Sequence, residues 1–334
     1  MTFQHIDERL PADDLTAQLQ ARVGDELARA IPAGPLALVD FPDHSNVGDS
    51  AIWLGEMAWL DDMRRTPVYS AALNNFAAAE LMQYAPEGPI LIHGGGNFGT
   101  TWPRHEALRL HLLRQFPGRP IIQLPQSLYY EDEGAAREMT EAIRGHGAFT
   151  LLVRDVRSLD YAQSRFDCEV RLCPDAALYL GRLQRAPARA DILALLRTDH
   201  ERVADAAAPP SGTICTDWLN EGAAERNLMR ARVKIDSLLS STAQAKRLRR
   251  YRMLAAWRLR RGLATLSQGR VVVTDRLHAH ILSLLLDIPQ VVLDNNYGKV
   301  SGFAAQWTRR YGGFHRASSR AEAFALARQL TGES

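Results

Sequence analysis

An arginine and a histidine, Arg276 and His278, stand two residues apart where a β-branched run passes directly into a helical pattern. The run at 270–273 is typical of a strand, and the helix is indicated by an apolar stripe of Leu277, Ile281, Leu284, Leu285 and Ile288. Thr274 or Asp275 is expected to cap this helix, which places both side chains in its first turn. Backbone N–H groups and the helix dipole favour an anion there, so the sequence predicts a site for a small, multiply charged anion.

His278 has an alternative explanation as a buried structural histidine, because apolar residues surround it at helical spacing. Arg276 counts against that alternative, since a cation and an imidazole in an apolar helix are costly to bury without an anionic partner. His280 lies about 200° around the helix from His278 and is the weaker candidate for a ligand contact.

A turn from Asn46 to Asp49 follows a predicted strand at 36–40 and leads into another helical pattern. Asp49 is a candidate acid or base that also orients a substrate hydroxyl, with Asn46 beside it. The alternative is that Asp49 or Ser50 merely caps the helix.

Three successive glycines, Gly94, Gly95 and Gly96, follow a predicted strand at 90–93 and precede Asn97. Their lack of side chains lets backbone N–H groups approach a ligand closely, although a tight turn is an alternative. The spacing fits neither the P-loop nor the dinucleotide-binding fingerprint, which disfavours a P-loop ATPase.

Polar side chains also end three further predicted strands, and these are Gln126 with Ser127, Arg154 with Asp155, and Asp175. Arg154 and Asp155 repeat the opening arrangement of an arginine at a strand end and an acid that can cap the next helix. The alternatives are a surface or capping ion pair for Arg154 and a helix cap for Asp175.

Short apolar runs alternate with helical patterns along the whole chain, which is the signature of βαβ units. The predicted strands lie at 36–40, 90–93, 121–124, 150–153, 170–173, 212–216, 270–274 and 290–294. Because they are continuously apolar, helices are expected to cover both faces of each sheet. We predict an α/β protein with two Rossmann-like domains and parallel sheets, residues 1–181 and 182–334, since 181–210 has the weakest strand signal. Ligands of such sheets bind beyond the carboxyl ends of the strands, where all these polar sequences lie.

Composition sets the remaining limits. A chain of 334 residues that is 46% hydrophobic can form two cores, and a net charge of +2 does not indicate a nucleic-acid binder. Three cysteines and the absence of a charged-then-apolar leader favour a reducing cytoplasm, and the cysteine spacing does not suggest a metal site. No run of apolar residues is long enough to predict a membrane-spanning helix.

The chain resembles the polysaccharide pyruvyl transferase family over most of residues 36–303. The resemblance rests on Asn46-Val47-Gly48-Asp49, His93-Gly94-Gly95-Gly96-Asn97-Phe98-Gly99, Leu124-Pro125-Gln126-Ser127, Arg154-Asp155, Pro174-Asp175 and Thr274-Asp275-Arg276-Leu277-His278. It implies a fold similar to the two-domain GT-B glycosyltransferases, with the active site in the cleft between domains. It also implies transfer of pyruvate, as a ketal, from phosphoenolpyruvate to two hydroxyls of a sugar.

By this resemblance, Arg154, Arg276 and His278 look like the family's donor-contacting residues. The planar forks of the arginines suit phosphate and carboxylate groups alike. We assign protonated His278 as the acid that protonates the donor methylene and Asp49 as the base that accepts the sugar proton. We group Gly94, Gly95, Gly96 and Asn97 with the donor, although the glycines could serve the acceptor, and assign Asn46, Gln126, Ser127 and Asp175 to the acceptor. We expect no metal and no cofactor apart from phosphoenolpyruvate as co-substrate.

Residues 226–261 carry twelve lysines or arginines against one acid, so this segment has a charge of +11 and the rest of the chain about −9. A solvated helical face is the simplest explanation. Since several family members act on lipid-linked oligosaccharides, we favour contact with an anionic inner membrane leaflet and a saccharide acceptor linked to polyprenyl; RNA is a poorer choice. We expect a cytoplasmic protein, peripheral on that membrane.

Two other functions compete with ketal transfer. A nucleotide-sugar glycosyltransferase of the GT-B type would use the arginines and the histidine to bind a diphosphate. A GDS-type esterase would use Ser50, and His93 with its glycines resembles the oxyanion loop of some lipases, but the chain lacks G-x-S-x-G and a late D-x-x-H.

Overall fold

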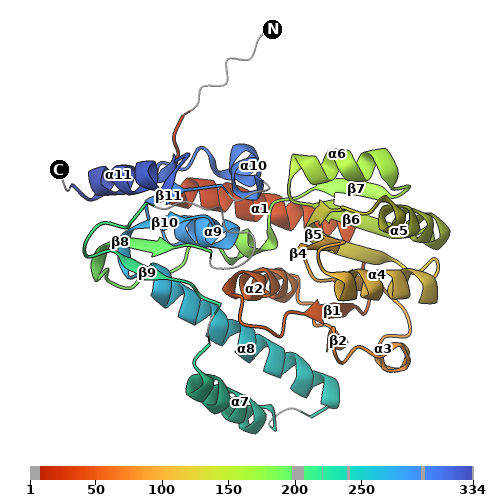
Figure 1. Ribbon diagram of the computed structural model, residues 1–334. Coiled ribbons are helices and arrows are strands. Elements are labelled where there is room, and N and C mark those ends of the chain that lie inside the picture. The colour runs from red at the N-terminus through yellow and green to blue at the C-terminus, as the bar shows by residue number, and fades with distance from the viewer. Residues whose placement is uncertain (1–7, 198–206, 220, 239–240, 295–297, 333–334) are drawn as a thin grey trace. The chain divides into compact units, whose positions relative to one another are not determined.

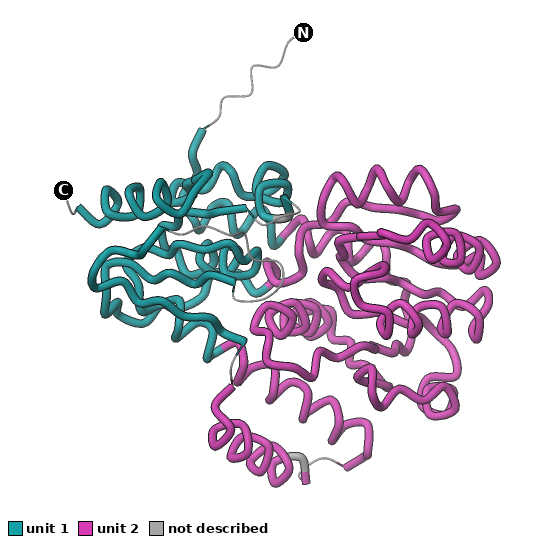
Figure 2. The backbone as a smooth tube through the Cα atoms, viewed as in Figure 1, with its two compact units in different colours: residues 1–20, 180–220, 260–334 teal, residues 21–179, 221–259 magenta. Residues whose placement is uncertain are grey.

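The computed structural model describes residues 8–197, 207–219, 221–238, 241–294 and 298–332 (Figure 1). The chain divides into two compact units (Figure 2), unit 1 with residues 1–20, 180–220 and 260–334 and unit 2 with residues 21–179 and 221–259. The two units differ from the domains predicted with a boundary at residue 182 in two segments. Residues 1–20 belong to the unit that holds most of the C-terminal half, and residues 221–259 belong to the unit that holds most of the N-terminal half.

Unit 2 contains a seven-stranded parallel sheet in the order β2-β1-β3-β5-β6-β7, with β4 paired to β5. The strands are β1 Ala37–Phe41, β2 Tyr69–Ala72, β3 Ile90–Ile92, β4 Gly95–Gly99, β5 Ile121–Tyr129, β6 Phe149–Val153 and β7 Glu169–Leu172. The five strands predicted in this region are confirmed. The structure adds β2, and also β4 at the position of the glycine run.

Helices cover both faces of this sheet, as the apolar strands predict. The helices of unit 2 are α2 Val47–Asp62, α3 Ala78–Tyr84, α4 Pro103–Gln115, α5 Glu133–His146, α6 Val156–Arg165, the 3₁₀ helix η1 Ala176–Leu180 and α7 Ala223–Ser237. Two longer helices, α1 Ala12–Ala30 and α8 Ala243–Leu266, contribute residues to both units. Successive residues Ala37, Leu38 and Val39 of β1 are all fully buried, which requires apolar cover on both sides.

Unit 1 contains a five-stranded parallel sheet in the order β12-β11-β10-β8-β9. Its strands are β8 Ala190–Leu195, β9 Ile214–Thr216, β10 Gly269–Thr274, β11 Gln290–Val292 and β12 Phe314–Arg316, and its helices are α9 Leu277–Leu285, α10 Lys299–Phe303, the π-helical turn η2 Ala304–Thr308 and α11 Arg320–Thr331. Within the described residues, no helix has both the length and the apolar character needed to cross a bilayer.

The segment with the weakest strand signal, 181–210, holds β8, a strand near the centre of this sheet that the sequence did not predict. The strand contains two alanines, which have low β-propensity. The strand forms because β10 and β9 pair with it on its two sides, and its own sequence does not indicate this pairing.

Each sheet has one point where the strand order reverses. In unit 2, β2 pairs with one side of β1 and β3 pairs with the other side. In unit 1, β9 pairs with one side of β8 and β10 pairs with the other side. Parallel sheets bind ligands at such switch points because the connections diverge and leave the carboxyl ends of the strands open. The switch points therefore lie between β1 and β3 in unit 2 and between β8 and β10 in unit 1.

Candidate functional site

The carboxyl edge of the unit 2 sheet brings several predicted site residues together. A Cβ atom placed on Gly95 would lie 3.6 Å from Oδ1 of Asp49, and one placed on Gly96 would lie 3.0 Å from a terminal nitrogen of Arg154. Nε of Arg154 donates to Oγ of Ser127 at 2.9 Å. Four segments that are widely separated in sequence thus meet beside the switch point of this sheet.

Arg154 is held by a buried carboxylate. Its Nη1 donates to Oδ2 of Asp175 at 2.6 Å, and the two side chains are 4% and 0% exposed, so the alternative of a surface ion pair is wrong. Oδ1 of Asp175 accepts from the N–H of Ala177 at 2.9 Å and caps η1. Asp155 caps α6, as expected, and accepts a 2.6 Å hydrogen bond from Ser127. These contacts fix the direction of the Arg154 guanidinium.

Asn46, rather than Asp49 or Ser50, is the N-cap of α2. Its Oδ1 accepts from the N–H of Gly48 at 3.1 Å, and its Nδ2 donates to Oδ2 of Asp49 at 2.7 Å. The capping alternative for Asp49 and Ser50 is therefore wrong, because an asparagine three residues earlier already occupies that position. Asp49 lies in the first turn, partly exposed, with Nε2 of His44 at 3.6 Å.

The glycines do not form an open loop, because they lead into β4 and pack closely against their neighbours. A Cβ on Gly94 would lie 2.7 Å from the carbonyl oxygen of Pro125, and Gly95 has a φ of +129° that favours glycine. The N–H of Gly94 donates to Oε1 of Glu56 at 2.8 Å. The N–H of Gly94 is thus already used within unit 2.

Asn97 and Gln126 belong to a buried network that the sequence did not indicate. Nε2 of Gln126 donates to Oδ1 of Asn97 at 2.8 Å, and the N–H of Asn97 donates to Oε1 of Gln126 at 3.2 Å. Arg109, fully buried on α4, donates to the carbonyl oxygen of Asn97 at 3.0 Å and to Gln123 at 2.7 Å. The sequence did not predict the role of Arg109, because nothing in a helical sequence shows that a particular arginine points into the core.

A carboxylate and an imidazole, Asp40 and His105, form a second unpredicted feature. Asp40 is the next-to-last residue of β1, is buried, and has a φ of 71°, which is strained for a residue with a side chain. Its Oδ2 lies 2.8 Å from Nδ1 of His105 on α4. Nδ1 of His105 also lies 3.1 Å from Nδ2 of Asn97, so Asp40 and Asn97 both hold the imidazole by this nitrogen.

His93 and Glu56 form a buried pair between the end of β3 and α2. Nδ1 of His93 lies 2.9 Å from Oε2 of Glu56, and both side chains are almost wholly inaccessible. Burial lowers the pKa of His93, but the Glu56 carboxylate outweighs burial and raises that pKa above its usual value. Glu56 therefore holds both His93 and the N–H of Gly94 in place.

In unit 1, the start of α9 differs in one respect from the prediction. Arg276 itself is the N-cap residue, and no side chain caps the helix. Oγ1 of Thr274 donates to the carbonyl oxygen of Leu195 at 2.7 Å, and Oδ1 of Asp275 accepts from the N–H of Arg197 at 2.9 Å. The expected cap by Thr274 or Asp275 is wrong because these two side chains bind the end of β8, across the switch point. His278 lies in the first turn, as predicted.

Arg276 makes an ion pair that was also not foreseen. Its Nη2 donates to Oδ2 of Asp217, which follows β9, at 2.6 Å, and both side chains are buried. The two predicted arginines thus share an arrangement: each follows the carboxyl end of a strand and is oriented by a buried carboxylate. Asp217 follows a short, weakly apolar strand, and only its place at a strand end could have indicated it.

His280 is structural, as its direction on the helix suggested. Nδ1 lies 3.0 Å from Oε1 of Gln290 and Nε2 lies 2.6 Å from Oγ1 of Thr308, and burial lowers the pKa of His280 to about 4.

This histidine is expected to make the protein acid-sensitive. Its pKa in the folded state lies below the value of 6.5 expected when unfolded, so its effect on stability is complete above pH 6.5 and is lost as the pH falls towards 4. The loss should reach about 3 kcal/mol in the free energy of unfolding. Urea unfolding of His280→Gln and wild type at pH 7 and pH 4.5 measures it. If wild type and His280→Gln lose the same free energy of unfolding between pH 7 and pH 4.5, His280 is not the group that causes the acid sensitivity.

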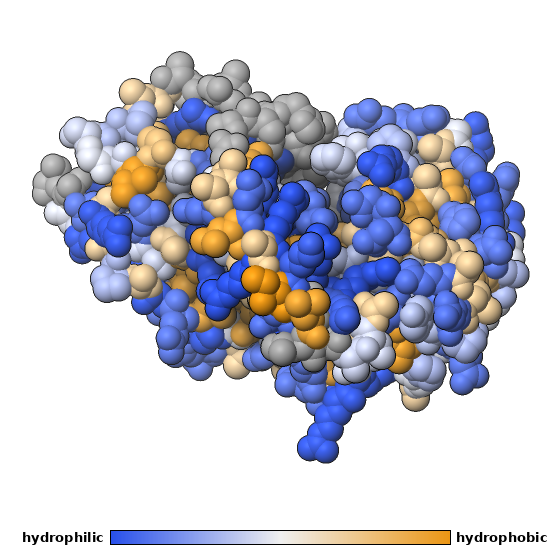
Figure 3. Space-filling view, turned by 90° about the horizontal axis from the view of Figure 1, so that it is seen from below, coloured by the Kyte–Doolittle hydropathy of each residue, from blue (hydrophilic) through white to orange (hydrophobic). Residues whose placement is uncertain are grey.

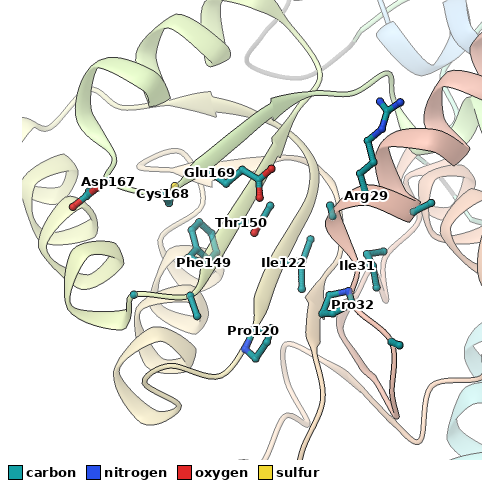
Figure 4. A pocket seen from close by; sticks show the side chains of 15 residues that line it. Arg29, Ile31, Pro32, Pro120, Ile122, Phe149, Thr150, Asp167, Cys168 and Glu169 are labelled. Carbon is teal, nitrogen blue, oxygen red and sulfur yellow. The ribbon is translucent and has the colours of Figure 1, made fainter.

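A surface cavity of about 640 Å³ lies at the other edge of the unit 2 sheet (Figure 4). Its wall includes Pro120 and Phe149, at the amino ends of β5 and β6, and the labelled side chains of Ile31 and Pro32 are apolar. Burial raises the pKa of Cys168 in this wall to about 12, so its thiol stays protonated. The predicted site residues of unit 2 lie at the opposite ends of the strands, so this cavity is not the predicted donor site.

Comparisons with known proteins agree with the sequence motifs. A family model described as polysaccharide pyruvyl transferase matches residues 46–297. Pyruvyl transferase 1 of Schizosaccharomyces pombe is 33% identical over 289 residues, which cover 81% of this chain and 69% of that protein. The putative pyruvyl transferase EpsO of Bacillus subtilis is 27% identical over 273 residues, covering 80% of this chain and 84% of that protein.

A solved structure of a functionally uncharacterised protein from Klebsiella pneumoniae also aligns, with a TM-score of 0.62 at 18% identity, over 90% of this chain and 99% of that one. This likeness supports the fold alone. The family match spans the predicted motifs from Asn46 to His278. The chain belongs to the polysaccharide pyruvyl transferase family, whose members are enzymes of pyruvyl transfer.

Proposed function

We propose that this pyruvyltransferase takes pyruvate from phosphoenolpyruvate and attaches it, as a ketal, to two hydroxyls of a saccharide. The observation that carries the proposal is the pair of buried arginines, Arg154 and Arg276, each fixed by a carboxylate at the carboxyl edge of its sheet. A guanidinium carries five N–H groups, so one carboxylate can orient it while other N–H groups bind a ligand. Each oriented guanidinium suits a phosphate or a carboxylate, the two anionic groups that this donor carries.

The reaction needs one proton donor and one proton acceptor. Protonation of the methylene carbon makes the central carbon of phosphoenolpyruvate electrophilic, and a sugar hydroxyl attacks that carbon and gives its proton to a base. The bond from the central carbon to the phosphate oxygen breaks, and the second hydroxyl forms the second C–O bond of the ketal. Of the two hydroxyl protons, one restores the acid and the other leaves with phosphate, so the scheme balances without a metal.

His278 is the proposed acid, since it lies in the first turn of α9, two residues after Arg276, which we propose binds the donor. Asp49 is the proposed base, because it is partly exposed and is oriented by Asn46. The Asp40 and His105 pair is a second candidate for the base, with a buried carboxylate orienting an imidazole, an arrangement typical of proton acceptors.

The acceptor is a saccharide, and we propose that it is carried on a polyprenyl lipid. Of the residues predicted to bind the acceptor, Asn46 is the one that donates a hydrogen bond to Asp49, and we keep it as an acceptor-binding residue. Gln126 and Ser127 bind Asn97 and Arg154, and Asp175 binds Arg154, so we propose that these three position other site residues.

The test is incubation with phosphoenolpyruvate and a panel of saccharides, following inorganic phosphate and the mass of the saccharide. We expect phosphate release to require both substrates and the product to gain the mass of pyruvic acid less water. His278→Gln should lower turnover about 10²–10⁴-fold, and the larger loss between Asp49→Asn and His105→Gln identifies the base.

Full turnover by His278→Gln would contradict its role. Sugar transfer from a UDP-sugar without phosphate release from phosphoenolpyruvate would favour the glycosyltransferase instead. The esterase alternative has little support, because Ser50 is fully buried in α2 and cannot meet a substrate.

A further inference from the structure

The basic segment at 226–261 uses its cations in two different ways. Arginines of α8 pair with carboxylates elsewhere in unit 2, in the pairs Arg247–Glu80 at 2.8 Å, Arg252–Asp61 at 2.6 Å and Arg258–Glu221 at 2.9 Å. Arg249 pairs with Asp236 at 2.6 Å. Much of the charge of α8 is therefore used to hold unit 2 together, and α7 is the part of the segment that needs another explanation.

Helix α7 buries one apolar face and exposes another. Met229 and Val233 are buried, as expected of the side that packs on the protein. Leu228, Ile235 and Leu238 are 73%, 69% and 68% exposed, which makes them the most exposed large hydrophobic side chains among the described residues. An apolar stripe on the outer side of a surface helix has no role in folding, so it indicates contact with something else.

The exposed stripe is bordered by cations on both sides. At about 100° per residue, Leu228, Ile235 and Leu238 fall within a sector of about 80°. Arg232 borders this sector on one side, and Arg230 and Lys234 lie beyond its other border, all three exposed. Figure 3, in which the face that carries α7 is towards the reader, shows apolar side chains grouped among hydrophilic ones.

We propose that α7 is an interfacial helix that binds the surface of an anionic lipid bilayer. Its apolar stripe enters the boundary between headgroups and acyl chains, and the flanking cations contact lipid phosphates, which is the arrangement of membrane-surface helices. The exposed cations of α7, Arg230, Arg232 and Lys234, attract this face to a negative surface. The proposal does not depend on the donor or acceptor of the reaction.

Other occupants fit the surface less well. A stable protein interface takes about 20–30 residues on each side, far more than this narrow stripe offers to a second copy of the chain. Nucleic acid would contact the cations but would leave the exposed leucines and isoleucine in water. A bilayer is the partner that uses both features of the helix.

Flotation of the full chain with phospholipid vesicles tests the proposal. We expect the protein to float with phosphatidylcholine vesicles that contain about 30% phosphatidylglycerol and to bind phosphatidylcholine alone at least tenfold more weakly. The double variant Leu228→Gln/Ile235→Gln should bind anionic vesicles about tenfold more weakly than wild type. Arg230→Gln/Arg232→Gln should lose affinity as well, and its remaining binding should depend less on salt.

Two matched variants serve as controls. Met63→Gln/Leu330→Gln removes two exposed apolar side chains elsewhere, and Arg137→Gln/Arg144→Gln removes two exposed cations from α5. Both should float like wild type. Equal flotation of wild type and Leu228→Gln/Ile235→Gln would overturn the proposal, as would equal binding to neutral and anionic vesicles. A wild-type dimer that this double variant abolishes, without vesicle binding, would assign the stripe to a second copy instead.

Discussion

Replacement of Arg276 by alanine is expected to lower kcat/KM for phosphoenolpyruvate by about 10²–10³-fold, the loss typical when one donor that stabilises developing charge is removed. Arg276→Lys should recover only part of this loss, because an ammonium cannot bind Asp217 and a planar anion with the same fork. Initial rates of phosphate release at varied phosphoenolpyruvate measure the effect.

Arg270 provides the matched control for this experiment, because it lies near the amino end of β10, whereas Arg276 follows the carboxyl end of that strand. Its 2.9 Å pair with Asp191 is exposed, so Arg270→Ala should leave both rate and stability nearly unchanged. If Arg276→Ala folds and retains the wild-type kcat/KM, Arg276 does not bind the donor. Arg276→Ala/Asp217→Ala separates the role of Arg276 in stability from its role in donor binding. The double variant removes the buried carboxylate that Arg276→Ala leaves behind, so it should recover stability, but it should not restore activity.

The position of the site could be predicted from the sequence because one topological rule governs it. Parallel strands place their carboxyl ends at one edge, so Asp49, Gly96 and Arg154 could be expected to meet although they are far apart in the chain. The structure confirms this for unit 2. The same rule applies in unit 1, where the residues after β8 and β10 bind one another.

The residues that hold the site could not be predicted in the same way. Glu56 and Arg109 lie in the middle of helices, and whether a helical charge is buried depends on which face meets the sheet. The strain at Asp40 arises at an irregularity in the pairing of β1 with β2, and β2 itself had no clear strand signal. Such residues are fixed by contacts between segments, which local sequence patterns do not encode.

The largest effect on stability is expected at the buried pair of Arg154 and Asp175. Asp175→Ala leaves the guanidinium of Arg154 nine-tenths buried without its carboxylate, and such a loss destabilises a protein by about 3–5 kcal/mol. The free energy of unfolding in urea measures this effect. Activity should fall as well, because Arg154 then loses the contact that fixes its direction.

An exposed pair with the same geometry tests whether burial is the cause. Arg114 and Glu138 also lie 2.6 Å apart but are 58% and 49% exposed, so Glu138→Ala should cost less than about 1 kcal/mol. Arg154→Leu/Asp175→Leu should be more stable than Asp175→Ala, since apolar replacement of a whole buried pair leaves no unpaired charge. That double variant should still lack activity, because a leucine cannot bind phosphate or carboxylate. If instead Asp175→Ala costs no more than Glu138→Ala, the pair does not hold unit 2 together, and Asp175 is better assigned to the acceptor, as the sequence first suggested.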